Sequence, residues 1–176
     1  VDLVNCLISM GAKIKGAGSD TIEIEGVDSL TGTSFSVMPD RVEVGTYLTA
    51  TAMTGGHVKI KSAKPEYLSS VITKLESSGA IIYTGEDWVE IKMEIDRPIS
   101  TSLTTGPYPS FPTDMQAQFV ALNSIAKGNS TITETVFENR FMHVQEIARM
   151  GGDITLKGNT AVIEGIKNLK GAPVMA

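Results

Sequence analysis

An acidic residue at the expected start of a helix has the chemistry of a catalytic base. The stretch from Pro109 to Phe119 reads PSFPTDMQAQF. Pro112 favours an extended approach, and Thr113 followed by Gln116 matches a capping box, so a helix should begin here. Asp114 would lie in the first turn, where free N–H groups and the helix dipole favour its ionised form. Such a carboxylate could meet a substrate hydroxyl, or it could serve only to stabilise the helix start.

The helix expected to carry Asp114 has one apolar face. Its apolar residues recur at spacings of four, three and four: Met115, Phe119, Leu122 and Ala126. That spacing is typical of a helix with one buried side. Gly128 supplies a stop signal, so the pattern predicts a helix over 114–127.

Composition narrows the possible partners. The 176 residues carry a net charge of -5, and Lys and Arg form no basic stripe, so a nucleic-acid partner is not expected. The sequence has no apolar run long enough for a membrane span and no signal sequence at Val1, which favours a cytoplasmic protein that does not bind a membrane. A single cysteine and two histidines give no spacing suited to a metal site, and we expect neither a metal nor a cofactor.

The sequence also contains a repeated pattern. A helix, a glycine, and then two strands recur around Gly11, Gly79 and Gly151, which lie 68 and then 72 residues apart. Before the second and third copies, a further helix and strand are expected at 41–54 with 57–61 and at 114–127 with 130–134. One full unit is therefore helix, strand, helix, strand, strand, which predicts an α/β (α+β) fold built from about two full repeats and a partial one.

Proline and polar residues mark the expected boundaries. Val37 to Asp40 includes a proline and is the most plausible junction between the partial repeat and the full ones. The chain begins inside an expected helix, which suggests that sequence belonging to the fold precedes Val1. Residues 96–112 form a long polar connection that leads into the Asp114 helix, and this segment is either a functional loop or a solvated crossover.

Three motifs stand out: Pro-Asp-Arg at 39–41 with Glu43 and Gly45, FPTDMQAQF at 111–119, and TETVFENRFMH at 133–143. Together they resemble the motifs of one enzyme family, the UDP-N-acetylglucosamine enolpyruvyl transferases, which begin bacterial peptidoglycan synthesis. The resemblance covers essentially the whole chain. The related enolpyruvylshikimate-phosphate synthases share the repeated fold, but the second and third motifs are not expected in them.

The resemblance implies an inside-out α/β barrel of two lobes, each with three repeats around buried helices and with the active site between the lobes. Residues 1–38 would be the C-terminal part of one lobe, and 40–176 two of the three repeats of the second lobe. The family also carries an upstream loop with a reactive cysteine and a downstream Asp-Leu-Arg stretch, and neither is present here. Cys6 takes the repeat position of Lys74 and Glu146, so it is expected to be structural.

The family reaction moves an enolpyruvyl group from phosphoenolpyruvate to the 3-hydroxyl of UDP-N-acetylglucosamine and releases phosphate. By resemblance, Asp114 would be the catalytic carboxylate and would contact substrate. Val136 would touch the nucleotide sugar, although it could instead be a strand residue that faces the core. Arg140 would lie near an anionic substrate, or it could form a salt bridge with Glu138 or Asp114.

Other readings of the chain remain open. The two histidines are expected to be structural, with His143 packed on a helix and His57 on the surface of a strand. The chain could also be a non-catalytic repeat module that binds a nucleotide sugar or a protein partner. If it is a fragment of the enzyme, we expect it to be inactive alone and to self-associate through faces that a missing repeat would cover.

Overall fold

A computed structural model describes residues 1–175. The chain divides into two compact units, Val1–Pro39 and Asp40–Ala176. Among the described residues, no helix combines the length and the apolar character that a membrane crossing requires.

The first unit is a helix followed by a small hairpin. Helix α1 spans Asp2–Ser9, and the strands β1 (Lys13–Lys15) and β2 (Glu23–Glu25) pair antiparallel, with Ile14 opposite Ile24. Every residue from 1 to 39 is at least partly exposed. Cys6 lies on α1 as a free thiol, in the mid-helix place that the repeat predicts.

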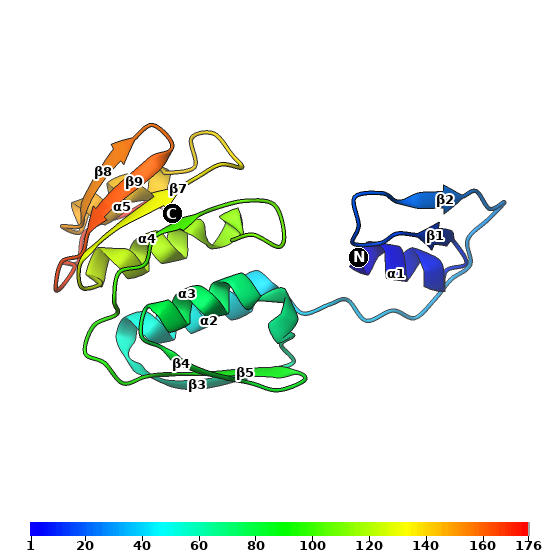
Figure 1. Ribbon diagram of the computed structural model, residues 1–176, viewed down its shortest axis with the longest axis horizontal. Helices are drawn as coiled ribbons and strands as arrows, with labels where there is room; N and C mark the ends of the chain where they lie inside the picture. Colours follow the sequence, from blue (N-terminus) through cyan, green and yellow to red (C-terminus); the bar gives the residue numbers. More distant parts are fainter. Residues whose placement is uncertain (176) are drawn as a thin grey trace. The chain divides into compact units, whose positions relative to one another are not determined.

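The second unit contains two repeats of the predicted order (Figure 1). The first comprises α2 (Arg41–Thr54), β3 (Gly56–Lys61), a short turn of 3-10 helix η1 (Pro65–Tyr67), α3 (Ser69–Ser77), β4 (Ile81–Thr84) and β5 (Trp88–Met93). The second comprises η2 (Thr113–Met115), α4 (Gln116–Ile125), β7 (Asn129–Thr133), α5 (Met142–Arg149), β8 (Asp153–Lys157) and β9 (Thr160–Glu164). The mixed α/β class predicted from the sequence is confirmed.

Each repeat forms its own sheet, with the last strand in the middle. The first sheet has the order β3-β5-β4, and β5 is antiparallel to both neighbours. The second has the order β6-β7-β9-β8, in which β6 is the short strand Leu103–Thr104 and β9 is antiparallel to β7 and β8. Strand β3 therefore runs parallel to β4 on either side of β5, so that β3, α3 and β4 form a split β-α-β unit.

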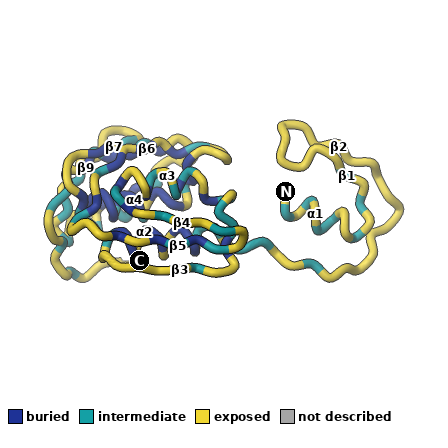
Figure 2. The backbone as a smooth tube through the Cα atoms, turned by 60° about the horizontal axis from the view of Figure 1, so that its bottom comes forward, coloured by how far each residue is buried: buried dark blue, intermediate teal, exposed yellow. Residues whose placement is uncertain are grey.

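The helices lie between the two sheets and form the core. Figure 1 shows α2 and α4 side by side, with the first sheet beyond α2 and the second beyond α4. Burial is concentrated on these helices and on the inner faces of the strands (Figure 2). The apolar face predicted for α4 is confirmed, since its four residues are all buried: Met115, Phe119, Leu122 and Ala126.

Three equivalent glycines end the second helix of each repeat. Gly11, Gly79 and Gly151 have φ angles of 101°, 95° and 92°. In each copy, the residue after the glycine donates its N–H to a carbonyl five residues back, and the glycine donates to one three residues back. This is the Schellman motif, which requires a left-handed residue and so favours glycine.

The predicted end of the Asp114 helix was wrong by two residues. Helix α4 ends at Ile125, and Ala126, rather than Gly128, is the residue that caps it. The guanidinium of Arg97 donates to the carbonyls of Ile125 and Ala126, at 2.9 and 2.8 Å, and also to those of Gly165 and Ile166, at 3.2 and 2.8 Å. A cation from a distant segment therefore satisfies carbonyls that the helix leaves without partners.

The segment 96–112, expected to be a polar connection, contains strand β6. Leu103–Thr104 pair parallel with Ile132 and Thr133 of β7. A further bridge links Thr105 to Phe111 and brings the segment back on itself immediately before η2. Part of the connection is therefore a sheet edge, and this edge fixes where the Asp114 turn begins.

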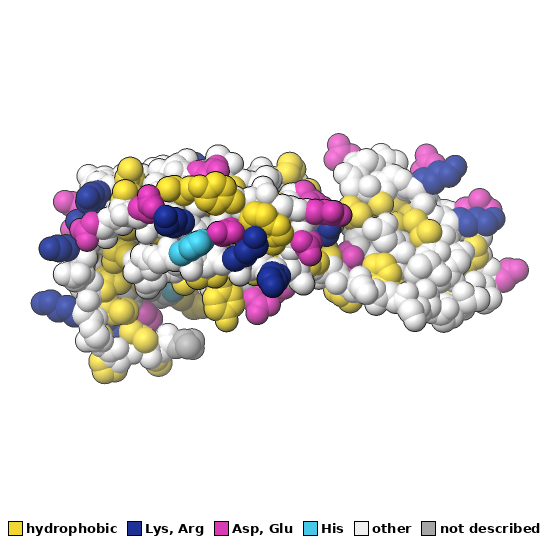
Figure 3. Space-filling view, turned by 90° about the horizontal axis from the view of Figure 1, so that it is seen from below, with side chains coloured by type: hydrophobic (Ala, Val, Ile, Leu, Met, Phe, Trp, Pro, Cys, Tyr) yellow, Lys and Arg dark blue, Asp and Glu magenta, His cyan; other side chains and the backbone are white. Residues whose placement is uncertain are grey.

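The outer face of the first sheet carries charges of both signs. On the face in Figure 3, acidic and basic side chains lie interspersed rather than gathered by sign. His57 lies on β3, as predicted, and its Nε2 is 2.6 Å from Oε1 of Glu90, while Lys59 Nζ is 3.4 Å from the other Glu90 oxygen. Surface pairs of this kind contribute little to stability.

We predict that Gly165→Ala destabilises the second unit. A Cβ at this position would lie 1.9 Å from the carbonyl oxygen of Ala126, a backbone atom that Arg97 also holds. Overpacking typically costs about 1–3 kcal/mol. Gly171→Ala is the control, since a Cβ there meets no atom within 4 Å. Urea unfolding measures both, and equal stabilities of the two variants would contradict the close approach.

Candidate active site

The turn that carries Asp114 is built differently from the predicted capping box. Thr113 to Met115 form the 3-10 turn η2, and neither η2 nor α4 has a side-chain cap hydrogen bond. The hydroxyl of Thr113 instead donates to Oε2 of Glu134, at 2.7 Å. The capping prediction was wrong because the threonine has a partner 21 residues away, directly after β7.

Glu134 is a buried carboxylate that four donors surround. Its exposed fraction is 2%. Oε1 accepts from the hydroxyl of Thr105 at 2.7 Å and from the N–H groups of Val136 and Phe137 at 2.8 and 3.2 Å, while Oε2 accepts from Thr113. The Asn159 side chain donates to the backbone carbonyl of Glu134 at 2.9 Å. The carboxylate thus joins the ends of β6 and β7 to the start of η2.

These donors determine the ionisation of Glu134. Burial by itself would raise the pKa of the carboxyl, but hydrogen bonds from Thr113, Thr105, Val136 and Phe137 together hold the pKa below its ordinary value. Donors stabilise the charged form directly, which is why a buried acid with several of them stays ionised. Glu134 is therefore a fixed negative charge inside the fold.

Arg140 joins this network to Asp114. Its Nη1 donates to Oγ1 of Thr113 at 2.9 Å, and its Nη2 forms a salt bridge with Oδ1 of Asp114 at 2.8 Å. The guanidinium also lies 5.1 Å from the ring centre of Phe137. Of the readings open from the sequence, the salt bridge to Asp114 is present in the structure. About half of the Asp114 side chain, 52%, remains exposed, and its Oδ2 has no hydrogen-bond partner among residues 1–175.

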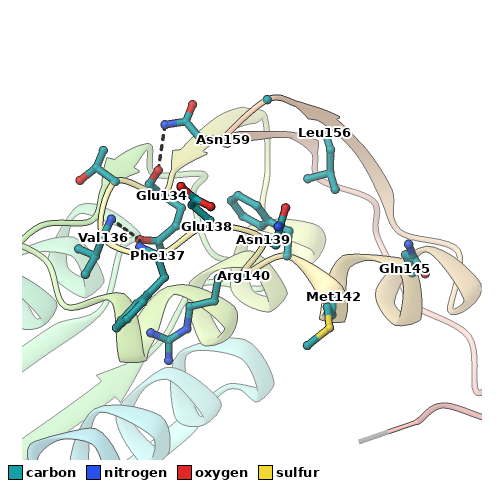
Figure 4. A pocket seen from close by; sticks show the side chains of 13 residues that line it. Glu134, Val136, Phe137, Glu138, Asn139, Arg140, Met142, Gln145, Leu156 and Asn159 are labelled. Carbon is teal, nitrogen blue, oxygen red and sulfur yellow. Dashed lines mark hydrogen bonds between the residues drawn. The ribbon is translucent and has the colours of Figure 1, made fainter.

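The loop after β7 borders an open hollow of about 740 Å³ (Figure 4). Residues 134–142 line one side, and Gln145, Leu156, Gly158 and Asn159 line the rest. Val136 and Arg140 both belong to the lining, whereas Asp114 lies beside it, at the far end of the Arg140 side chain. Val136 is 39% exposed, so the alternative that it faces the core as a strand residue was wrong.

The structure therefore brings the three candidate residues into one region. Asp114 and Arg140 are in direct contact, and Val136 shares the loop of Arg140 and donates its N–H to Glu134.

His143 lies on α5 and is partly buried, as predicted for a packing residue. Burial, and then the charge of Arg140, lower the pKa of His143 below its ordinary value.

Glu134 is the residue that sequence reasoning missed, although the pattern contained a signal for it. Alternate residues Ser130, Ile132 and Glu134 all face inward and are buried. A charged residue at an inward position of a strand pattern requires several hydrogen-bond donors. As for metals, the part of the chain that the structure describes contains no group of three or more His, Cys, Asp or Glu placed to hold one.

We predict that Glu134→Gln lowers the free energy of unfolding by about 1.5–3 kcal/mol near pH 7, the usual worth of hydrogen bonds to a charged group. The folded-state pKa is lowered, so the carboxylate stabilises the fold above its unfolded pKa of about 4.3 and loses that effect as the pH falls through the folded value. The difference from wild type should therefore shrink below about pH 4.

Urea unfolding from pH 7 to pH 3 measures this difference. Glu138→Gln is the matched control, because Glu138 is exposed in the same loop and accepts no hydrogen bond among the described residues. A Glu134→Gln penalty that stays constant across the pH range would contradict the ionised network.

Two solved structures share the fold. The enolpyruvyl transferase NikO from Streptomyces tendae matches with a TM-score of 0.82 at 24% sequence identity, over 93% of this chain and 39% of NikO. EPSP synthase from Acinetobacter baumannii matches with a TM-score of 0.59 at 17% identity, over 96% of this chain and 39% of that protein. The chain thus spans about two fifths of the length of either protein.

The family itself is identified by the sequence. The model of the family described as EPSP synthase (3-phosphoshikimate 1-carboxyvinyltransferase) matches residues 1–176, which is the whole chain. The two structural matches, whose identities are low, bear on the fold alone and agree with this family. The chain therefore belongs to the EPSP synthase family of enolpyruvyl transferases.

Proposed function

We propose that the protein containing this chain transfers an enolpyruvyl group from phosphoenolpyruvate to the 3-hydroxyl of UDP-N-acetylglucosamine and releases phosphate. The observation that carries the proposal is the half-exposed Asp114 carboxylate, held by Arg140 at the first turn of a helix beside an open hollow. In this proposal, residues 1–38 end one lobe, and 40–176 supply two of the three repeats of the second lobe.

Asp114 would act on the acceptor hydroxyl. The alcohol oxygen attacks C2 of phosphoenolpyruvate, C3 gains a proton, and loss of phosphate with a proton from C3 then restores the double bond. An alcohol is a very weak acid at neutral pH, so a positioned carboxylate must take its proton as the C–O bond forms. Oδ2 of Asp114 is available for this, because Arg140 contacts only Oδ1.

Arg140 and Val136 would bind substrate. The guanidinium uses one N–H on Thr113 and one on Asp114, which leaves further donors for a phosphate or carboxylate. The side chain of Val136 is exposed at the hollow, where a sugar ring would find an apolar contact. Its backbone N–H donates to Glu134, so a backbone contact with the sugar would use the carbonyl.

A second acceptor is 3-phosphoshikimate, which the description of the matching family names. The motifs at 111–119 and 133–143 favour UDP-N-acetylglucosamine, whereas the family match favours neither acceptor over the other. Both reactions share phosphoenolpyruvate and the release of phosphate, so the acceptor alone separates them.

We predict that the full-length protein releases phosphate from phosphoenolpyruvate with UDP-N-acetylglucosamine and not with 3-phosphoshikimate. The measurement is phosphate release, run with each acceptor in turn and with phosphoenolpyruvate alone as the background. Turnover only with 3-phosphoshikimate would replace the first acceptor with the second. Absence of turnover with both, from a folded full-length protein, would reject the enzyme proposal in favour of a binding module.

We also predict that Asp114→Asn lowers turnover by about 10²–10⁴-fold, the usual contribution of a general base. The amide keeps the shape of the side chain but cannot take a proton. Loss of the favourable dipole interaction in the first turn should cost only about 0.3–1 kcal/mol of stability. The measurement is paired: the rate of phosphate release and the thermal midpoint of the same sample.

Asp153→Asn is the control for the loss of one exposed negative charge in the same repeat, because Asp153 does not line the hollow, and we expect this variant to keep most of the wild-type turnover. The catalytic role of Asp114 fails if Asp114→Asn unfolds many degrees earlier while its rate per folded molecule stays near wild type. That result would make Asp114 a residue that only stabilises the helix start.

A further inference from the structure

Glu134 is only 2% exposed, yet a single hydroxyl, that of Thr113, separates it from Arg140, the partner of the proposed catalytic residue Asp114. We infer that Glu134 is a positioning residue that, through the hydroxyl of Thr113, fixes the guanidinium of Arg140. Arg140 in turn holds Asp114. The catalytic consequence of this inference rests on the proposed function. The positioning of the Arg140 guanidinium can be measured without turnover.

The argument begins with the single proton of the Thr113 hydroxyl. Oε2 of Glu134 is an acceptor only, because the carboxyl is ionised, so the Thr113 proton must point to it. The lone pairs of Oγ1 are then directed elsewhere, and Nη1 of Arg140 donates to one of them at 2.9 Å. The charge of Glu134 thus determines which way the hydroxyl points, and the hydroxyl determines where Arg140 finds its acceptor.

The guanidinium is rigid and planar, so fixing one of its nitrogens orients the other. With Nη1 on Thr113, Nη2 reaches Oδ1 of Asp114 at 2.8 Å. The ring of Phe137, 5.1 Å away, limits rotation on one side. Oδ2 of Asp114, the oxygen proposed to meet the substrate hydroxyl, is therefore oriented by contacts that lead back to Glu134.

Glu134 also holds the loop that carries Arg140. Oε1 accepts the N–H groups of Val136 and Phe137, and this contact turns the chain immediately after β7. Thr105 donates to the same oxygen and accepts the N–H of Thr135 at 3.0 Å. The two carboxylate oxygens therefore have separate tasks, since Oε1 shapes the loop and Oε2 directs the Thr113 hydroxyl.

This division provides a matched pair of variants. Thr113→Val keeps the shape of the side chain but removes the hydroxyl between Oε2 and Arg140. Thr105→Val removes one hydroxyl from the Oε1 side of the same carboxylate, together with its contact to the N–H of Thr135. The backbone N–H groups of Val136 and Phe137 still donate to Oε1 and hold the loop of Arg140. A purely structural role predicts similar behaviour for both variants, whereas positioning predicts that only Thr113→Val disturbs Arg140. Thr113→Ser keeps the hydroxyl and is the conservative rescue.

The first measurement is ¹⁵N NMR of the full-length protein with labelled arginine, in which Arg140→Lys identifies the Arg140 side-chain signals. We expect separate Nη signals, typical of hindered rotation, in wild type, Thr113→Ser and Thr105→Val. Averaged Nη signals are expected in Thr113→Val and Glu134→Gln. Separate Nη signals that persist in Thr113→Val would overturn the inference, whatever the protein catalyses.

The second measurement is the rate of phosphate release per folded molecule. We expect kcat of Thr113→Val to fall on the order of 10²-fold, a loss that a small misplacement of reacting groups can cause. The change in KM should be much smaller. Thr113→Ser and Thr105→Val should remain within roughly threefold of wild type in kcat, because the reacting groups stay in place. Equal losses in Thr113→Val and Thr105→Val would overturn the inference.

Failure of the proposed function and failure of the positioning inference give different results. If no acceptor supports phosphate release, the proposed function fails, and the NMR measurement still decides whether Glu134 positions Arg140. If Asp114→Asn abolishes turnover while Thr113→Val does not, the function stands and the positioning inference is overturned.

Discussion

The arrangement of the candidate site depends on a negative charge buried in the fold. A carboxylate without water must be surrounded by donors, and Glu134 draws its donors from three parts of the chain: Thr105, Thr113 and the loop at 136–137. Those parts cannot move independently without leaving the charge unpaired. The requirement to satisfy one acid therefore fixes the start of η2 and the loop of Arg140 relative to each other.

The close packing of α2 and α4 places this network at one end of the helix pair. Gly45 on α2 lies where a Cβ would be 2.9 Å from the sulfur of Met115, and Gln118 donates to the hydroxyl of Thr46 at 3.0 Å. The first turns of the two helices thus lie side by side. Asp40 caps α2 by accepting the N–H of Val42 at 2.7 Å. Both helix N-termini, which favour negative charge, are found at the end that carries Asp114.

Much of this architecture was predictable because it rests on local patterns. The order of elements in the repeats, the bounds of α2 at 41–54 and the apolar face of α4 all follow from periodicity and short-range signals. The capping box failed, and Glu134 was missed, because their hydrogen bonds join residues far apart in the sequence. Thr113 meets Glu134 across 21 residues, and Arg97 reaches Gly165 across 68. No local pattern contains such partners.

The strand order has a consequence for how the chain folds as it is synthesised. In each repeat the strand made last, β5 or β9, lies between the two made earlier. A nascent chain that ends at β4 holds two strands that share no hydrogen bonds, because β3 pairs only with β5 among the described strands. Pairing across such separations is slow compared with local contacts. The first sheet therefore forms only when β5 has left the ribosome, and in the second sheet only the short β6–β7 pair can form before β9 is available.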